Sequence, residues 1–168
     1  MASQSTSGQP LLSGEQYLSF MLDDEEYGVD ILRVQEVRGW TPVTRLPASP
    51  PYIKGVLNLR GAIVPVVDLR ECFGFPVRPY GPTTVVVVVR ALHEDQERVI
   101  GLVVDAVAET YHIDADQIRP APRLESTIRP DFIAGLATVE ERMIVMLDLD
   151  HLLSADELAL DGVETEDE

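Results

Sequence analysis

Three aspartates each follow an apolar run, and carboxylates in such positions could serve acid–base catalysis or bind a cation. Asp68, Asp105 and Asp148 close the runs IVPVV, GLVV and MIVML. The same placement is typical of Asp as a helix or turn cap, because its side chain accepts a hydrogen bond from a nearby backbone N–H. Asp150 stands close to Asp148, but no Gly-rich acidic loop of the calcium-binding kind accompanies the pair. We interpret these aspartates as caps.

The other reactive side chains are dispersed along the chain. His93, His112 and His151 are separated by 19 and 39 residues, and no second histidine or cysteine follows at helical spacing, so a zinc site is not expected. Cys72 has no histidine near it in sequence and stands among apolar residues, which favours a small buried hydrophobe over a nucleophile. Gly-rich phosphate-binding motifs are missing. We therefore expect no catalytic activity, no metal and no cofactor.

The charge balance argues against nucleic acid and anionic membrane as partners. The 168 residues include 13 Lys and Arg against 29 Asp and Glu, a formal net charge of −16, whereas phosphate and anionic lipid need clustered basic residues. The longest aliphatic run, 85–89, is far shorter than the roughly 20 apolar residues of a membrane-spanning helix. Residues 1–14 lack the basic and apolar regions of a signal peptide. We expect a cytoplasmic protein without direct membrane insertion.

Short β-strands must position these side chains. Apolar runs separated by turns and prolines predict strands at 17–22, 27–31, 34–40, 56–59, 62–69, 83–89, 99–107, 135–139 and 143–149. Short helices are predicted at 51–54, 70–73 and 150–160, and a polar loop at 93–98. Pro65 lies within a run, and since proline has no N–H to donate we expect an edge position there. The pattern is typical of a β-sandwich or small barrel.

Both ends differ in composition from the rest of the chain. Residues 1–14 are rich in Ser, Gly and Gln and predict a disordered tail. From Ser154 onward the chain has seven acidic residues and no basic one, and solubility is sufficient to explain this acidity. We expect a folded domain over 15–160 and an acidic tail over 161–168.

An internal repeat divides the folded part into two β-units, 15–80 and 81–153, which could exchange strands. Residues 53–73 and 133–153 align without a gap, with identities at Ile53/Ile133, Gly55/Gly135, Asp68/Asp148 and Leu69/Leu149. A weaker match relates 28–36 to 101–109. The groove between two such units is a natural binding site.

The two copies differ most at a hairpin tip. Arg60-Gly61 in the first copy corresponds to Glu140-Glu141 in the second. A basic tip on an acidic protein favours a contact with a partner's carboxylate or carbonyl groups. A solvated turn residue is the alternative.

Four parts of the chain stand out together: EEYGVDILRVQEVRGW at 25–40, IKGVLNLRGAIVPVVDLR at 53–70, GLVVDAV at 101–107 with QIRPAP at 117–122, and FIAGLATVEERMIVMLDLDHLL at 132–153. These segments resemble the CheW family, the coupling proteins of bacterial chemotaxis. The N-L-R-G hairpin followed by IVPVVDL is the most specific part. The resemblance covers about residues 15–160. It implies a mostly β fold of two intertwined SH3-like five-stranded β-barrel subdomains with a few short helices.

Membership of this family implies a non-catalytic adaptor of a two-component signal transduction system. Such a scaffold couples the cytoplasmic tip of methyl-accepting chemoreceptors to the regulatory domain of the histidine kinase CheA, in receptor arrays at the inner membrane. The resemblance implies a receptor-binding groove formed by Ile31, Val34, Glu36, Asn58, Leu59, Arg60 and Gly61. It places kinase contacts at the exposed barrel ends, for which the expected residues are Gly101, Val103, Val139 and Met143.

Two other functions stay open at this point. One is a scaffold of the same fold in a parallel pathway, such as pilus motility. The other is a small enzyme or a ligand-binding barrel.

Overall fold

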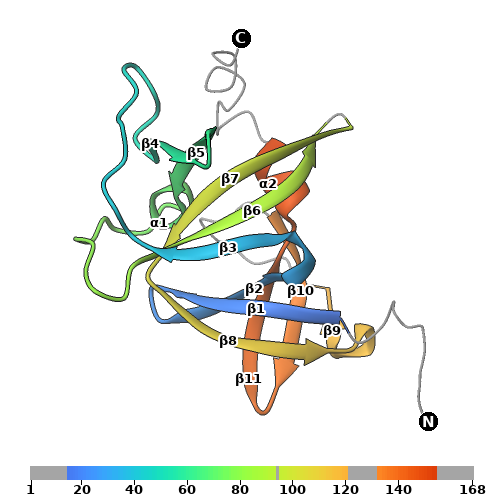
Figure 1. The fold of residues 1–168 in the computed structure, drawn as a ribbon. Coiled ribbons are helices and arrows are strands. Elements are labelled where there is room, and N and C mark those ends of the chain that lie inside the picture. Colours follow the sequence, from blue (N-terminus) through green and yellow to red (C-terminus); the bar gives the residue numbers. More distant parts are fainter. Residues whose placement is uncertain (1–14, 94, 121–131, 155–168) are drawn as a thin grey trace.

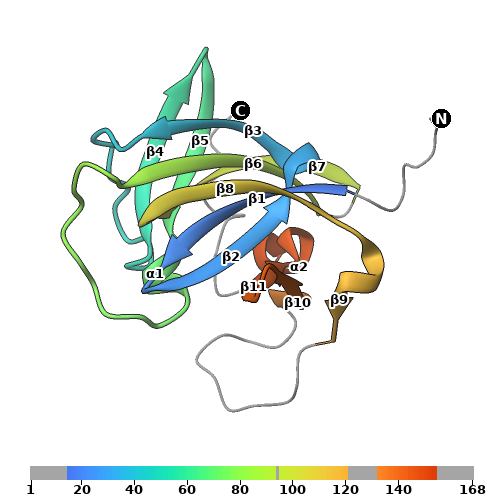
Figure 2. The same cartoon turned by 90° about the horizontal axis from the view of Figure 1, so that it is seen from below.

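The computed structural model of this chain describes residues 15–93, 95–120 and 132–154. The expected tails, 1–14 and 161–168, lie outside these residues. The described strands form two sheets, packed against each other (Figures 1 and 2). No helix in these residues combines the length and apolar character needed to cross a membrane.

The first sheet has the order β8-β1-β2-β11-β10-β9. Its strands are β1 (Glu15–Leu22), β2 (Glu25–Asp30), β8 (Ala106–Ile113), β9 (Ile118–Arg119), β10 (Ile133–Val139) and β11 (Arg142–Leu147). The second sheet has the order β3-β6-β7-β5-β4. Its strands are β3 (Val34–Gly39), β4 (Ile53–Leu59), β5 (Ala62–Asp68), β6 (Val85–His93) and β7 (Gln96–Val104). Short helices follow two hairpins, α1 (Leu69–Cys72) and α2 (Leu149–Ser154), and two 3₁₀ turns, η2 (Ile31–Arg33) and η3 (Ala115–Gln117), join strands.

The valine run of β6 shows why this sequence needs two packed layers. Val86 and Val88 face a cluster inside the second sheet, whereas Val87 and Val89 face the main core shared by both sheets. A strand that is buried on both faces is continuously apolar rather than alternating. A third apolar cluster, around Tyr111 and Ile144, lies in the interior formed by the first sheet. Each curved sheet therefore has its own interior, and the main core lies between them.

The two sequence copies contribute strands to both sheets. The first sheet pairs β1 and β2 with β8, β10 and β11, and the second pairs β6 and β7 with β3, β4 and β5. Figure 1 shows the exchange, with the blue β1 and β2 beside the orange β10 and β11. The parallel contacts are equivalent, because Gly28 lies opposite Met146 and Gly101 opposite Val66. The boundary at residue 80 thus divides the copies in sequence but does not divide the sheets.

A glycine at the same repeat position lets another segment cross each hairpin. A Cβ on Gly55, which has φ +148°, would lie 2.2 Å from the carbonyl oxygen of Thr44. A Cβ on Gly135 would lie 2.8 Å from the carbonyl oxygen of Arg119. Thr44 bridges to β4 next to Gly55, and Arg119 in β9 pairs with β10. Since both contacts are shorter than any real Cβ makes, a side chain at either glycine would push the crossing segment away.

The mostly β architecture with few short helices is confirmed, but several local predictions are wrong. No helix forms at 51–54, where a turn leads directly into β4. The strand expected at 99–107 is divided at Asp105, where the chain passes from β7 in one sheet to β8 in the other. The polar loop at 93–98 is much shorter, since β6 extends to His93 and β7 begins at Gln96.

Two further expectations are met only in part. Pro65 does not lie in an edge strand, because β5 is between β7 and β4. However, the ladder from β5 to β7 begins at Val66, so Pro65 is paired only to β4. The helices at 70–73 and 150–160 correspond to α1 and α2, and residues 155–160 lie outside the described part of the chain.

Candidate functional site

The Arg60-Gly61 turn is a rigid two-residue hairpin. Arg60 has φ 53° and Gly61 has φ 90°, so both residues occupy the left-handed region that such hairpin turns require. The backbone N–H of Gly61 donates to Oδ1 of Asn58 across 2.9 Å. The side chain of Arg60 is 74% exposed. The turn therefore holds a guanidinium at the tip of the hairpin, facing solvent.

One acidic side chain connects this tip to the opposite edge of the sheet. Nη2 of Arg60 lies 2.8 Å from Oε1 of Glu36, and Nη1 of Arg38 lies 3.3 Å from Oε2. The hydrogen bond from Arg60 is the main cause that lowers the pKa of Glu36, against the opposing effect of burial. Because β3 and β4 are the two edges of their sheet, the ion pair closes this sheet into a barrel.

The remaining residues predicted for receptor binding do not share one environment. Ile31 and Val34 are half-buried and pack against the main core. Leu59 is only 5% exposed and belongs to the cluster inside the barrel, so its side chain is not part of the surface. Strand alternation explains this, because Leu57 and Leu59 point inward while Asn58 between them points outward.

The receptor-binding set predicted from the sequence leaves out three exposed apolar side chains of the segments 25–40 and 53–70. Leu32 is 67%, Ile63 50% and Val37 42% exposed. Val37 lies between Glu36 and Arg38 on the other face of β3, and Ile63 lies directly across the hairpin from Asn58. Side chains alternate between the two faces of a strand. Val37 therefore faces away from Glu36, and Ile63, paired with Asn58, faces away from Leu59, so this alternation could have identified both residues from the sequence.

The four residues expected at the kinase contact separate into two pairs. Gly101 and Val103 are buried in β7, a middle strand, so their side-chain positions are not part of the surface. Val139 is half-buried and Met143 is 59% exposed, both next to the Glu140-Glu141 turn between β10 and β11. The continuously apolar run at 99–104 is the signal in the sequence that β7 is covered on both faces.

In the first sheet a similar ion pair connects the start of β11 to the edge strand β8. Nη2 of Arg142 lies 3.3 Å from Oε2 of Glu109 on β8, and Nη1 lies 3.7 Å from Oε1 of the buried Glu26. The same guanidinium donates to the phenol oxygen of Tyr111. Burial, and then the neighbouring Glu26, raises the pKa of Tyr111 to about 12. Glu109 is the repeat counterpart of Glu36. Its partner Arg142 follows the hairpin turn, whereas Arg60, the partner of Glu36, lies within the turn.

The strand-end aspartates are structural, as their positions predict. Oδ1 of Asp68 accepts from the backbone N–H of Glu71 at the start of α1, and Oδ2 accepts from the phenol of Tyr80. Asp148 accepts from the backbone N–H of His151 in the same way across 3.0 Å. Asp105 does not cap a helix. Its Oδ2 accepts from the backbone N–H of Asp23, and so it anchors the turn between β1 and β2.

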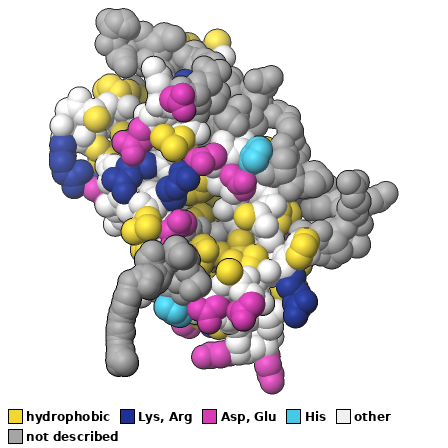
Figure 3. All heavy atoms as spheres, turned by 90° about the vertical axis from the view of Figure 1, so that its right-hand side faces the viewer, with side chains coloured by type: hydrophobic (Ala, Val, Ile, Leu, Met, Phe, Trp, Pro, Cys, Tyr) yellow, Lys and Arg dark blue, Asp and Glu magenta, His cyan; other side chains and the backbone are white. Residues whose placement is uncertain are grey.

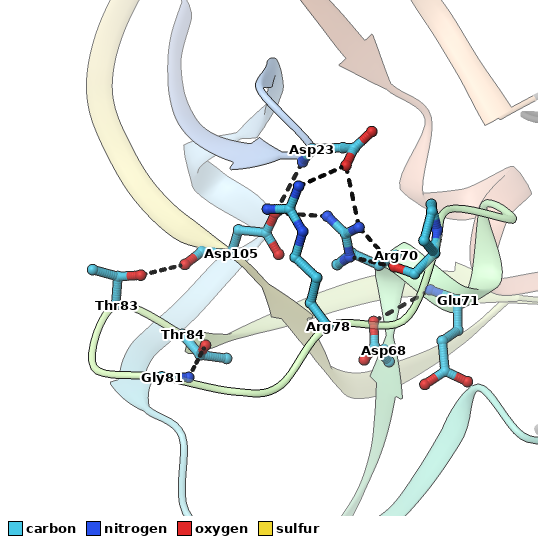
Figure 4. Close-up of polar contacts among 10 residues, drawn as sticks. Asp23, Asp68, Arg70, Glu71, Arg78, Gly81, Thr83, Thr84 and Asp105 are labelled. Carbon is cyan, nitrogen blue, oxygen red and sulfur yellow. Dashed lines mark hydrogen bonds and ion pairs between the residues drawn. The ribbon is translucent and has the colours of Figure 1, made fainter.

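A buried arginine connects these turns (Figure 4). The side chain of Arg70, on α1, is 3% exposed, and its Nη1 lies 2.9 Å from Oδ2 of Asp105. Nη2 lies 3.2 Å from Oδ1 of Asp23, and Nε lies 3.0 Å from the carbonyl oxygen of Pro76. Arg78, which is exposed, contacts the same carboxylate of Asp23. Each nitrogen of the buried guanidinium thus has a partner, which explains how a charge is tolerated at this junction of the two sheets.

The rest of the described surface offers little for catalysis. Within the described residues, no three side chains of His, Cys, Asp or Glu are grouped so that they could hold a metal ion. Cys72 is half-buried and packs against the main core. On the face shown in Figure 3, acidic and basic side chains are interspersed around a hydrophobic patch, and no single basic area covers it.

Comparison with known proteins agrees with this geometry. The family model described as CheW-like domain matches residues 16–157. The chemotaxis protein CheW of Klebsiella aerogenes is 46% identical over 147 residues, which covers 88% of this chain and 86% of that protein. The chain also resembles protein PilI of Pseudomonas aeruginosa, at 33% identity over 103 residues that cover 61% of this chain and 55% of PilI.

A solved structure shares the fold over nearly the same length. The crystal structure of the scaffolding protein TtCheW from Thermoanaerobacter tengcongensis superimposes with a TM-score of 0.76 at 35% identity, covering 86% of this chain and 95% of that one. The family model, the identity to these relatives and the shared fold agree with one another. The chain belongs to the CheW-like family.

Proposed function

We propose that this chain is an adaptor that couples the cytoplasmic tips of chemoreceptors to the histidine kinase CheA. The exposed Arg60, held by Glu36 at the end of a rigid turn, is the observation that carries the proposal. The printed names of the relatives, chemotaxis protein CheW and scaffolding protein TtCheW, support it.

The receptor contact is assigned to the Arg60 turn and the neighbouring apolar side chains. Val37 and Ile63 offer exposed apolar surface, and Ile31 and Val34 are half-buried beside them in sequence. A receptor tip is a helical hairpin, whose residues at i, i+3 and i+4 would pack on such side chains. Arg60 would donate to carboxylate or carbonyl groups at the tip. Asn58 and Gly61 hold the turn, and Glu36 positions the guanidinium.

The kinase contact is assigned to the opposite barrel, at the β10–β11 hairpin. Met143 is exposed and Val139 half-buried there, next to the acidic turn Glu140-Glu141. An exposed apolar side chain at a hairpin end is a typical anchor of a small interface. One hairpin tip is basic, at Arg60, and the other is acidic, at Glu140-Glu141, which is consistent with two different partners. One surface would bind the receptor while the other binds the kinase at a receptor array.

A scaffold of the same kind in pilus motility is the second candidate. The similarity to PilI supports it, but over a smaller part of the chain and at lower identity than the similarity to CheW of Klebsiella aerogenes. The same Arg60 and Met143 surfaces would then bind the receptor and kinase of that pathway.

Titration against each partner separately tests the proposal. A receptor cytoplasmic fragment and the regulatory domain of CheA are each titrated with the wild type, Arg60→Glu and Met143→Glu. Arg60→Glu should weaken only the receptor complex and Met143→Glu only the kinase complex. Arg119→Glu, at an exposed position on β9, is the matched charge control and should change neither. Wild-type protein that binds neither partner would disprove the adaptor function.

A further inference from the structure

A groove of about 860 Å³ lies at the end of β4 far from the Arg60 turn. Trp40 and the segment 77–80 form one wall, since the rings of Trp40 and Tyr80 are in contact, and residues 42–51 of the loop between β3 and β4 form the opposite wall. The volume is in the range of pockets that bind small ligands or short peptides. Neither the receptor surface nor the kinase surface proposed above includes this groove.

The aromatic wall of the groove is held in place from behind. The rings of Trp40 and Tyr80 meet edge to face with their centroids 4.5 Å apart. The phenol of Tyr80 donates to Asp68, and the backbone N–H of Trp40 donates to the carbonyl oxygen of Thr84 across 3.1 Å. Both residues are half-buried and pack against the cluster inside the barrel. The wall is therefore preformed.

The opposite wall cannot move away or accept an added strand. The bridge between Thr44 and Val56, with N···O distances of 3.0 and 2.8 Å, fixes the loop to the edge of β4. Gly55 permits this close approach, as described above. The backbone groups of β4 at this point are already paired, so a bound peptide cannot extend the sheet here. Recognition must come from side chains.

The charge of the groove is opposite to that of the chain. Among the described residues that line it, Arg45, Lys54 and Arg78 are basic, Glu71 alone is acidic, and five are prolines. Glu71 is paired with Lys54 across 2.5 Å. Arg78 also contacts Asp23, so the lining keeps a small basic excess on a protein of net charge −16, with Arg45 at the rim. Proline-rich peptides in the extended polyproline conformation bind in aromatic-lined grooves, with proline packed on the rings.

We propose that this groove binds an extended acidic peptide containing proline, supplied by a partner protein. Proline side chains of the peptide pack against Trp40 and Tyr80. Its carboxylates lie opposite Arg45 and Arg78, which are both exposed at the rim.

Trp40 is the one tryptophan of the sequence and reports directly on the groove. The full chain is titrated with a synthetic peptide of alternating glutamate and proline at about 0.15 M salt, where screening beyond roughly 8 Å limits the effect of the acidic rest of the protein. Trp40 emission is followed, and calorimetry measures the same titration independently. We expect saturable binding in the micromolar range.

Charge variants decide whether the acidic peptide binds in the groove. Arg45→Glu should weaken binding about tenfold or more, whereas the control Arg119→Glu should leave it unchanged, with melting curves showing that both variants are folded. A peptide of alternating glutamine and proline should bind at least tenfold more weakly. The proposal is overturned if the acidic peptide gives no saturable signal by either method, if both variants lose affinity equally, or if the neutral peptide binds as well.

The chain's own acidic residues 155–168 could occupy the groove in place of a partner's peptide, and a truncated chain tests this alternative. The chain that ends at Ser154 should show the same Trp40 emission and the same peptide affinity as the full chain. A changed emission before any peptide is added, together with tighter peptide binding, would show that the groove holds this segment instead and would overturn the partner proposal.

Discussion

The guanidinium of Arg60 lies 2.8 Å from the carboxylate of Glu36 and so joins the β4–β5 turn to the far edge of its sheet. In the second copy of the repeat the equivalent elements are also connected by an ion pair, with Arg142 at the start of β11 paired to Glu109 on β8 across 3.3 Å. The arginine has a different place in each hairpin. In the first copy it stands in the turn and is exposed, while in the second it stands after the turn and leaves two glutamates at the tip. The same kind of ion pair therefore accompanies two surfaces of opposite sign.

The Arg60 surface can be tested by a charge swap. Arg60→Glu removes the donors and brings a second carboxylate to Glu36, so receptor affinity should fall about 30-fold. The double variant Arg60→Glu with Glu36→Arg restores an ion pair but reverses the sign of the tip. If Arg60 contacts the receptor directly, the double variant binds as weakly as the single one. Recovery of affinity in the double variant would instead assign Arg60 a purely structural role.

Arg70 should be the least replaceable charge in the described part of the chain. Arg70→Ala leaves the carboxylates of Asp23 and Asp105 without their buried partner at the junction of the two sheets. The free energy of unfolding, measured in urea, should fall by about 3 kcal/mol. Arg78→Ala is the control, since Arg78 contacts Asp23 from an exposed position, and should change stability by less than about 0.5 kcal/mol. Similar losses in the two variants would refute the role given to Arg70.

The acidic turn of the second copy is strained relative to the first. Glu141 has φ 70°, whereas the equivalent position holds Gly61 with φ 90°. Glycine enters this region without a steric penalty, so Glu141→Gly should stabilise the protein by about 0.5–1 kcal/mol in urea unfolding. The reciprocal variant Gly61→Ala should destabilise it by a similar amount. A destabilising Glu141→Gly would mean that the Glu141 side chain has an interaction that outweighs the strain.

Two aspartates should give opposite pH dependences. Burial raises the pKa of Asp68 above its usual 3.8, so its contribution to stability is full below 3.8 and is lost as the pH rises through the folded-state pKa. The hydrogen bond from Arg33 lowers the pKa of Asp150, so its contribution is full above 3.8 and is lost as the pH falls through the lower folded-state pKa.

Urea unfolding at a series of pH values separates the two groups. As the pH rises from 3 to 7, Asp68→Asn should gain stability relative to wild type, because Asn keeps the cap without the buried charge. Over the same range Asp150→Asn should lose stability relative to wild type. Parallel curves for both variants would contradict the assigned environments.

The sequence predicts the strands and the repeat well because both rest on local alternation and apolar runs. It does not predict the change of sheet at Asp105, because the break in the apolar run is visible there but the strands that pair on either side of it are distant in sequence. The position of Gly101 and Val103 in a middle strand is likewise decided by pairing with distant strands. Arg60 could be selected from the difference between the copies. Its partner Glu36 was selected only through the family resemblance, as nothing local relates β3 to the hairpin tip.

The central claim is that one chain binds receptor and kinase simultaneously through different barrels. The most direct measurement is sedimentation of the full chain mixed with a receptor cytoplasmic fragment and the regulatory domain of CheA. The account predicts a single species that contains all three proteins, from which Arg60→Glu releases only the receptor and Met143→Glu only the kinase domain. Displacement of one partner by the other, with no species containing all three, would contradict it.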